Sequence, residues 1–312
     1  MNYTLYMLLL LSLYTADSNT TSFMQSSVKK ITSFFTPHSL EKIDHKELST
    51  TSLTSIAIEN HNGPITIKTG WKKNYLCLKT IRRAKKQTDL DTIKIIADST
   101  QPHHLAITTK HTGEKIKGSV EYELIVPAAL TVSLKTENGD ISINDIEGSV
   151  RTITNNGSIS VINASNSIYA ESTTHGNIYI QSACGPVEAL SYTGDITINN
   201  AHNSVTAHST KGKITVDYVT LPYDSSVQLA TTTGNITLTT PPSIQAQIKG
   251  STSYGTVFSD HYITIDSYTT QLNNNAWNKF KKEVNGVIGS EQAHISLCST
   301  HGNIKILQTK ST

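Results

Sequence analysis

Paired carboxylates are the first residues of this chain whose types and spacing could support catalysis. Asp140 and Asp195 each follow the glycine of a recurring motif, so a repeating structure would place both on one face. An acid and a base that cleave a glycosidic bond lie about 5–9.5 Å apart. Three repeats separate these two residues, which is about 14 Å at the spacing of neighbouring strands. Asp145 is nearer to Asp140, but the two flank one short strand rather than converge. We therefore expect no catalytic residues and no enzyme activity.

The histidines were considered as metal ligands. The chain has 12 of them. His103 and His104 are adjacent, and adjacent residues of a strand point to opposite faces of the sheet. His175 and His301 each precede a glycine of the motif but lie many repeats apart. The sequence contains no zinc-site spacing, calcium-binding nonapeptide or phosphate-binding loop. We expect neither a metal nor a cofactor.

The densest positive charge lies between residues 68 and 86, where no acidic residue interrupts it. One interpretation is an anion-binding patch for acidic glycan, lipid headgroup or nucleic acid. The other is a solvated edge strand and loop, whose lysines discourage pairing with a second sheet edge, and this second interpretation is favoured. A net charge of +2 is too small to indicate a nucleic-acid partner, so none is expected. The residues of the candidate patch are Lys72, Lys73, Lys79, Arg82, Arg83, Lys85 and Lys86.

Asp140 and Asp195 belong to a strand motif that repeats about every 18 residues, and this repeat must position their side chains. It reads Thr/Ser-x-x-Gly-x-Ile-x-Ile, begins at Thr136 and recurs for the last time at Ser299. Midway between its glycines lies a second short strand, such as the one at Val150-Arg151-Thr152. One such unit cannot bury its own apolar face, but a stack of units can. The chain is therefore predicted to be all-β, with a parallel β-solenoid of about 18-residue coils. The glycines of the motif are Gly139, Gly157, Gly176, Gly194, Gly212 and Gly234.

Stacking the coils in register predicts columns of like residues in the core. One column is Ile141, Ile159, Ile178, Ile196, Ile214 and Ile236, and the opposing column is Val150, Ile168, Val187, Val205 and Val227. The Thr or Ser three residues before each glycine is expected to point inward and bond the backbone of the turn. The glycines are expected at corners that need a positive φ.

Irregular segments flank this repeat. Residues 51–135 are predicted to form an irregular β region that precedes the solenoid and caps its first coil, with a tight turn at Gly63-Pro64. The solenoid is expected to occupy residues 136–312. It is interrupted by an insertion at about 256–294, in which residues 273–284 are predicted to form a short amphipathic helix.

The first residues indicate export. The apolar run from Leu5 to Leu13 has the length of a signal-peptide core and is too short to span a bilayer. Residues 1–18 are accordingly predicted to be a signal peptide, and residues 19–50 a linker with a short helix around residues 40–48. The protein is then expected in the periplasm, on the outer surface or outside the cell. It is not expected to be an integral membrane protein after processing.

Three stretches resemble a known family: IENHNGPITI at residues 58–67, ELIVP at 123–127 leading into LKTENGDI at 134–141, and GVIG at 286–289 followed by THGNI at 300–304. With these the chain resembles the bacterial putative-adhesin family of β-strand-repeat domains of unknown function. It is similar, more distantly, to the head domains of auto-transporter adhesins. The resemblance implies adhesion and supplies no catalytic or binding residues.

These observations predict a non-enzymatic, adhesin-like or scaffold protein that presents a rigid β-solenoid to a surface ligand, either glycan or protein. A degenerate carbohydrate-active or carbohydrate-binding β-helix is one alternative. An envelope-associated assembly factor is the other, and it would require that the apolar run at Leu5 to Leu13 is not a signal peptide.

Overall fold

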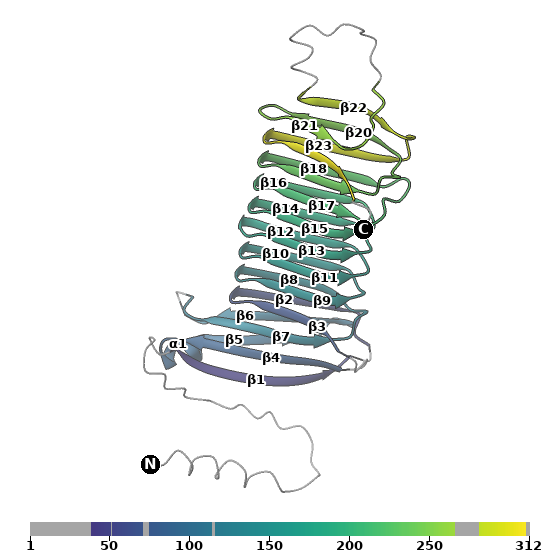
Figure 1. Cartoon of the computed structure of the whole chain (residues 1–312). Coiled ribbons are helices and arrows are strands. Elements are labelled where there is room, and N and C mark those ends of the chain that lie inside the picture. Colours follow the sequence, from purple (N-terminus) through teal and green to yellow (C-terminus); the bar gives the residue numbers. More distant parts are fainter. Residues whose placement is uncertain (1–38, 51, 71–74, 114–115, 266–280, 310–312) are drawn as a thin grey trace, which may run out of the picture.

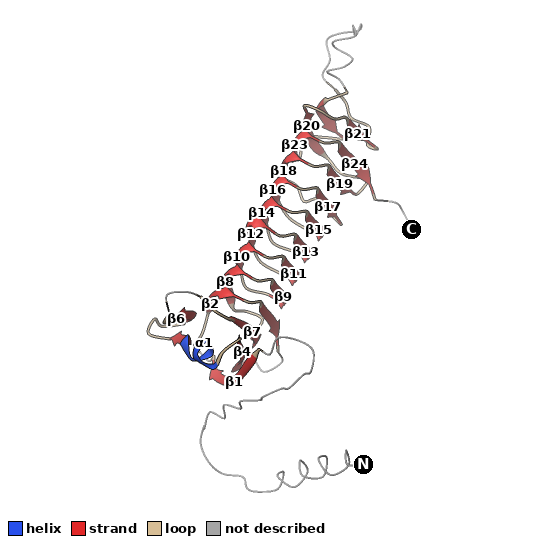
Figure 2. Cartoon of the chain, turned by 90° about the vertical axis from the view of Figure 1, so that its left-hand side faces the viewer, coloured by secondary structure: helices blue, strands red, loops and turns tan. Residues whose placement is uncertain are grey.

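Two parallel layers of strands make up the molecule. The computed structural model describes residues 39–50, 52–70, 75–113, 116–265 and 281–309. Within these ranges the chain forms two 12-stranded sheets stacked along one axis (Figures 1 and 2). In the described part of the chain there is one short helix, α1 (Gln87–Thr92), at the N-terminal end of the stack. Among the described residues, no helix is long and apolar enough to cross a membrane. The all-β solenoid prediction is confirmed, and its cross-section has two sides.

The strands of sheet A, in spatial order, are β1 (Leu40–Ser49), β4 (Tyr75–Ala84), β7 (Ser119–Val126), β3 (Ile65–Thr69), β9 (Ile141–Ile146), β11 (Ile159–Ala164), β13 (Ile178–Ala183), β15 (Ile196–Ala201), β17 (Ile214–Tyr218), β19 (Ile236–Thr240), β24 (Ile304–Gln308) and β21 (Val257–Ser259).

The strands of sheet B, in spatial order, are β22 (Glu283–Ile288), β20 (Ala246–Thr252), β23 (Ala293–His301), β18 (Ser226–Thr233), β16 (Val205–Lys211), β14 (Val187–Thr193), β12 (Ile168–His175), β10 (Val150–Asn156), β8 (Thr131–Asn138), β2 (Ser55–Asn62), β6 (His104–His111) and β5 (Ile93–Asp98).

The core lies between the two sheets and consists of the predicted columns. Ile159 pairs in register with Ile141 on one side and Ile178 on the other, and all three are buried. On sheet B, Val187 pairs in register with Ile168 and Val205. Burying an aliphatic side chain contributes about 1.5–3 kcal/mol, so the columns stabilise strands that are individually short.

A buried hydroxyl closes the corner after eight of the sheet B strands. Thr154 Oγ1 donates to the carbonyl oxygen of Gly139 in the preceding coil at 3.0 Å, and Ser209 bonds Gly194 in the same way at 3.0 Å. Across the stack these bonds measure 2.8–3.4 Å. The prediction that this Thr/Ser column points inward and bonds the turn backbone is confirmed.

Close approach requires glycine at these corners, and at most of them a positive φ does so as well. A Cβ atom added at Gly194 would lie 2.0 Å from the carbonyl oxygen of Gly176. Gly157, Gly176, Gly194 and Gly234 have positive φ between 153° and 159°, whereas Gly139 and Gly212 do not. The predicted positive φ is found at four of the six glycines, and at all six the coils stack too tightly for any side chain.

Positive φ angles also fall on non-glycine residues in the sheet A strands. Asp145, Asn163, Ser182 and Asn200 have φ between 55° and 59°. Asn and Asp adopt this left-handed conformation more readily than other non-glycine residues. Each directly precedes a buried residue, such as Ala164, and turns the end of its strand back toward the core. This second column of turn residues is not among the features predicted from the sequence.

At both ends the order of strands in space departs from their order in the chain. The coil β2–β3 lies between β6–β7 and β8–β9, and the coil β23–β24 lies between β18–β19 and β20–β21. β2 and β3 belong to different sheets, so Gly63-Pro64 is a solenoid corner and not a hairpin turn. Parallel pairing of β2 with β8 means that the repeat extends before residue 136.

Two local predictions are corrected. Residues 40–48 form strand β1, antiparallel to β4, rather than a linker with a helix, because pairing along the whole strand overrides a weak local preference. Most of the helix predicted at 273–284 lies outside the described residues. Glu283 and Val284 begin strand β22, which pairs with β20, so the helix does not extend to that point.

Candidate functional site

An open groove runs along the outer face of sheet B, parallel to the solenoid axis, from β8 to β16. Its cavity measures about 500 Å³. We call it the axial groove. Outward side chains on either side of a buried Val or Ile in each strand form its two walls. One wall is Thr131, Ser149, Ser167, Pro186 and Ser204, and the other is Ser133, Arg151, Tyr169, Glu188 and Thr206.

The second wall has an aromatic ring between two opposite charges. Arg151, Tyr169 and Glu188 occupy equivalent positions on β10, β12 and β14, as the strand register requires. The Arg151 guanidinium carbon lies 4.1 Å from the centre of the Tyr169 ring. Within the described residues no hydrogen bond or ion pair engages the exposed Arg151 or Glu188 side chain. Both charged groups therefore face solvent with their hydrogen-bonding capacity free.

Tyr169 is fixed in this position. Its hydroxyl donates to a carboxylate oxygen of Glu171 at 2.6 Å. Desolvation raises the pKa of Tyr169 to about 12, and the bond to the Glu171 carboxylate acts in the same direction. The phenol therefore stays protonated at neutral pH. Its hydrogen bond to Glu171 holds the ring beside the Arg151 side chain.

The first wall consists mainly of hydroxyl groups in a row. Ser167 Oγ donates to Ser149 Oγ at 3.0 Å, and Ser204 Oγ accepts the backbone N–H of Ser226 at 3.0 Å. Each hydroxyl can both donate and accept, so those along the groove keep capacity for a ligand. The groove thus combines hydroxyls, an aromatic ring and planar charged groups at positions fixed by the strand register.

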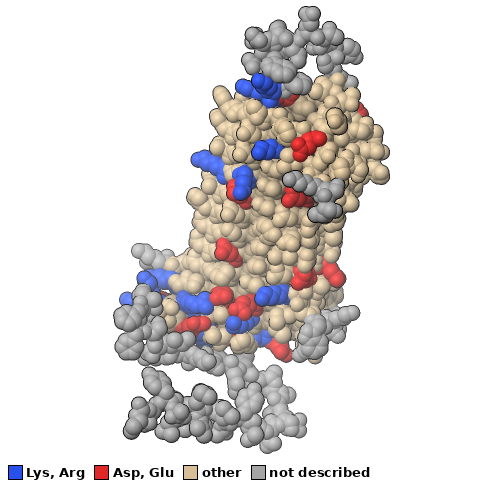
Figure 3. Space-filling view, viewed as in Figure 1, with Lys and Arg blue, Asp and Glu red and all other residues tan. Residues whose placement is uncertain are grey.

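The predicted anion-binding residues lie mostly on β4, between acidic strands. Lys79 pairs with Glu123 of β7 at 2.9 Å, and Arg83 pairs with Glu121 at 2.6 Å. Arg82 pairs with Asp44 of β1. In the face shown in Figure 3, charges of both signs gather at this end of the stack. Three of the predicted cations are thereby neutralised across the sheet.

The other members of that patch are separate from these pairs. Lys85 and Lys86 follow β4 and are exposed, and no ion pair engages them within the described part of the chain. Lys72 and Lys73 lie outside the described residues. Anion binding by these lysines stays a prediction.

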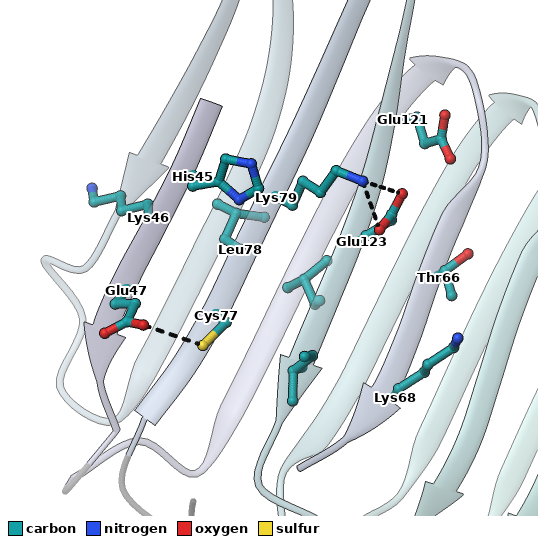
Figure 4. Close-up of a pocket in the computed structure, with 12 residues that line it drawn as sticks. His45, Lys46, Glu47, Thr66, Lys68, Cys77, Leu78, Lys79, Glu121 and Glu123 are labelled. Atoms are coloured by element: carbon teal, nitrogen blue, oxygen red, sulfur yellow. Dashed lines mark hydrogen bonds and ion pairs between the residues drawn. The ribbon is translucent and has the colours of Figure 1, made fainter. Parts of the chain in front are cut away.

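A hollow of about 630 Å³ lies beside the same strands, over β1, β4, β7 and β3 (Figure 4). Lys79 reaches across it to Glu123, and the Cys77 thiol donates to Glu47 at 3.9 Å, a long contact. His45, Lys46 and Lys68 are further polar residues of its lining. Two contacts join lining residues to one another, Lys79 to Glu123 and Cys77 to Glu47.

The carboxylates considered for catalysis have structural partners. Asp140 accepts the backbone N–H of Ser158 at 2.7 Å, and Asp195 accepts that of Lys213 at 2.9 Å. Asp145 accepts the side-chain amide of Asn163 at 2.7 Å. Each carboxylate thus bonds the equivalent position of the next coil, 18 residues on.

Two histidines that sequence analysis did not connect meet at one corner. The rings of His61 and His111 lie 5.5 Å apart, and His61 Nδ1 lies 3.1 Å from a Glu137 carboxylate oxygen. Burial lowers the pKa of His111, as does the neighbouring His61. Across the described ranges, no group of three or more His, Cys, Asp or Glu side chains is arranged to hold a metal.

Comparison with known proteins gives one match over most of the chain. Residues 53–307 match the family model described as Toastrack DUF4097. A search of curated proteins gives no match.

Solved structures of low sequence identity also resemble the chain. A putative adhesin from Bacteroides fragilis NCTC 9343 is 12% identical with a TM-score of 0.45, over 85% of this chain and 97% of that one. A putative cell adhesion protein from Clostridium sporogenes ATCC 15579 is 12% identical with a TM-score of 0.26, over 86% of this chain and 100% of that one. A putative adhesin from Parabacteroides merdae ATCC 43184 is 8% identical with a TM-score of 0.32, over 86% and 96%.

Proposed function

The chain belongs to the Toastrack DUF4097 family, a family of unknown function, and from this premise we propose that it is a non-enzymatic, adhesin-like binding and scaffold protein of the cell envelope or cell surface. The parallel register of the solenoid supports the proposal best. Residues of equivalent position, such as Arg151, Tyr169 and Glu188, stand side by side on the outer face. A binding surface built on paired strands is more rigid than one built on loops.

The edge of sheet A at β1 supports a role as a separate scaffold. A sheet edge recruits further strands unless it is blunted. Edge strand β1 carries charges on both faces, and its Glu41 and Asp44 pair with the arginines of β4. Such an edge disfavours stacking of a second molecule end to end. The outer faces of the two sheets are then available for binding, while the β1 edge does not pair with a second molecule.

Export is the second part of the proposal, supported by the apolar run at Leu5 to Leu13. Protease shaving of intact cells, probed with an antibody to residues 139–238, tests it. We expect degradation in intact cells and a mature chain that begins after about residue 18. Protection of a processed chain would place the protein in the periplasm as a scaffold. Protection of a chain that keeps Met1 would overturn export and favour the envelope-associated assembly factor.

A further inference from the structure

The axial groove has the length and direction to hold a linear polymer. It crosses five neighbouring strands of sheet B, from β8 to β16. At 4.7–4.9 Å between strands, this corresponds to about 19 Å along the axis. The walls repeat one set of positions per strand, so a chain lying along the groove meets a new pair of side chains at each step.

The lining chemistry selects among polymers. Hydroxyl groups of Ser149, Ser167 and Thr206 donate and accept hydrogen bonds. The Arg151 guanidinium offers coplanar donors, and the Glu188 carboxylate offers two acceptors, as neighbouring hydroxyls of a sugar require. Tyr169 lies between them, half-buried, with the Arg151 guanidinium over one face of its ring. We propose that the axial groove binds an extended, neutral polysaccharide whose chain runs along the solenoid axis.

The charges of the groove favour a neutral ligand. Arg151 and Glu188 lie one strand on either side of Tyr169, so the positive and negative groups are close and balanced. An anionic polymer lying along the groove would approach the Glu188 carboxylate wherever it gained contact with Arg151. A neutral sugar chain uses both groups without this repulsion. This inference rests on the proposed binding function and specifies its ligand class.

Tyr179 provides a matched control within the same coil. It stands on β13 of sheet A, and its hydroxyl donates to Gln181 at 2.6 Å, much as that of Tyr169 donates to Glu171. Tyr179 does not line the axial groove. Replacing either tyrosine removes a half-buried ring with one hydrogen bond two residues along its own strand, so the two substitutions place similar demands on the fold.

Affinity electrophoresis of the full chain in native gels tests the proposal. The gels contain hydroxyethylcellulose or galactomannan as neutral polysaccharides, or alginate as an anionic one. We expect at least one neutral polymer to retard the wild-type protein. Tyr169→Ala should weaken this interaction roughly ten-fold or more, about 1.4 kcal/mol, whereas Tyr179→Ala should leave it unchanged. Glu188→Gln, at an exposed position, keeps the test valid if Tyr169→Ala fails to fold, and it should also weaken binding.

Three outcomes would overturn the assignment: no retardation by either neutral polymer, retardation by alginate alone, or equal loss in the Tyr169 and Tyr179 variants. Protease shaving is independent of these results. Exposure at the cell surface without polysaccharide binding would leave a surface scaffold with another partner. Binding by the purified protein, together with an unprocessed N-terminus, would instead support the groove and contradict export.

Discussion

At the scale of single residues, the buried hydroxyl column makes a specific contribution to stability. Thr154 is fully buried, and its Oγ1 donates to the carbonyl oxygen of Gly139. Thr154→Val keeps the shape of the side chain but leaves that oxygen without its side-chain donor. Leaving a buried polar group unsatisfied costs about 1–3 kcal/mol, and we expect the free energy of unfolding to fall by this amount in urea titrations.

Thr197→Val is the matched control for that substitution. Thr197 lies on the outer face of β15, half-buried, and pairs in register with Thr215 on the neighbouring strand. A surface change of this kind usually alters stability by less than about 0.5 kcal/mol. An equal loss of stability in the two variants would show that the hydroxyl-to-carbonyl bond is not what Thr154 contributes.

A buried histidine at the C-terminal end predicts acid sensitivity. His261 shares a hydrogen bond with the Thr240 hydroxyl at 2.9 Å, and Gln308 lies 3.4 Å from its other ring nitrogen. Burial lowers the pKa of His261 in the folded state, against smaller opposing effects of a hydrogen bond with the Leu307 backbone and of the Asp260 charge. The unfolded chain therefore binds the proton more tightly. The contribution of neutral His261 to the free energy of unfolding should be fully present above about pH 6.5. It should decline as the pH falls below that value.

His261→Gln removes the titrating group and retains hydrogen-bonding capacity. We expect the stability difference between pH 7.5 and pH 5 to shrink in this variant, measured by urea unfolding at each pH. The other histidines titrate in both proteins and cancel in the comparison. An unchanged difference would mean that His261 is protonated equally well in the folded and unfolded chains.

At the scale of elements, the inverted order of coils at the C-terminal end has a measurable consequence. Strands β23 and β24 are the last in the chain but are paired on both sides, whereas β21 and β22 lie at the sheet edges. Hydrogen exchange should therefore be slow in β23 and β24, comparable with β15 and β16, and faster in β21 and β22. Fast exchange in β24 would show that the chain end frays despite its interior position.

The same inversion explains which elements could be predicted from sequence. Between Gly139 and Gly234 each coil pairs with the next one in the chain, about 18 residues on, so periodicity predicts the register. At the ends the pairing is remote. Asn62 bonds Asn138 across 76 residues, and Asn303 bonds Asn235 across 68. No periodic signal encodes such contacts, so the sequence predicts only a tight turn at Gly63-Pro64 and not the place of β2–β3 in the stack.

The axial groove was equally inaccessible to sequence reasoning. Its charged and aromatic residues, Arg151, Tyr169 and Glu188, share only an outward position in successive coils, and their residue types follow no motif. The basic run on β4 was conspicuous in sequence, yet its partners Asp44, Glu121 and Glu123 come from strands whose pairing was not predictable.

At the scale of the whole molecule, the solenoid behaves as a one-dimensional stack. Each coil in the middle contacts only the coil above and the coil below. The stability of such an array is approximately a sum of coil terms and nearest-neighbour interfaces. A defect in the middle should therefore separate two blocks that otherwise unfold together, whereas the same defect at an end should cause local fraying.

Ile196→Ala and Ile248→Ala test this directly. Both isoleucines are fully buried; Ile196 lies on β15 in the middle of the stack, and Ile248 lies on β20 beside the edge strand β22. Each substitution should cost about 2–5 kcal/mol locally. In hydrogen exchange, Ile196→Ala should weaken protection in the coils on both sides of β15. Ile248→Ala should affect β20 and β22 while β11 to β17 stay protected. A uniform loss of protection in both variants would instead mean that the molecule unfolds as a single cooperative unit. The interfaces between neighbouring coils would then contribute more to stability than the intrinsic stability of each coil.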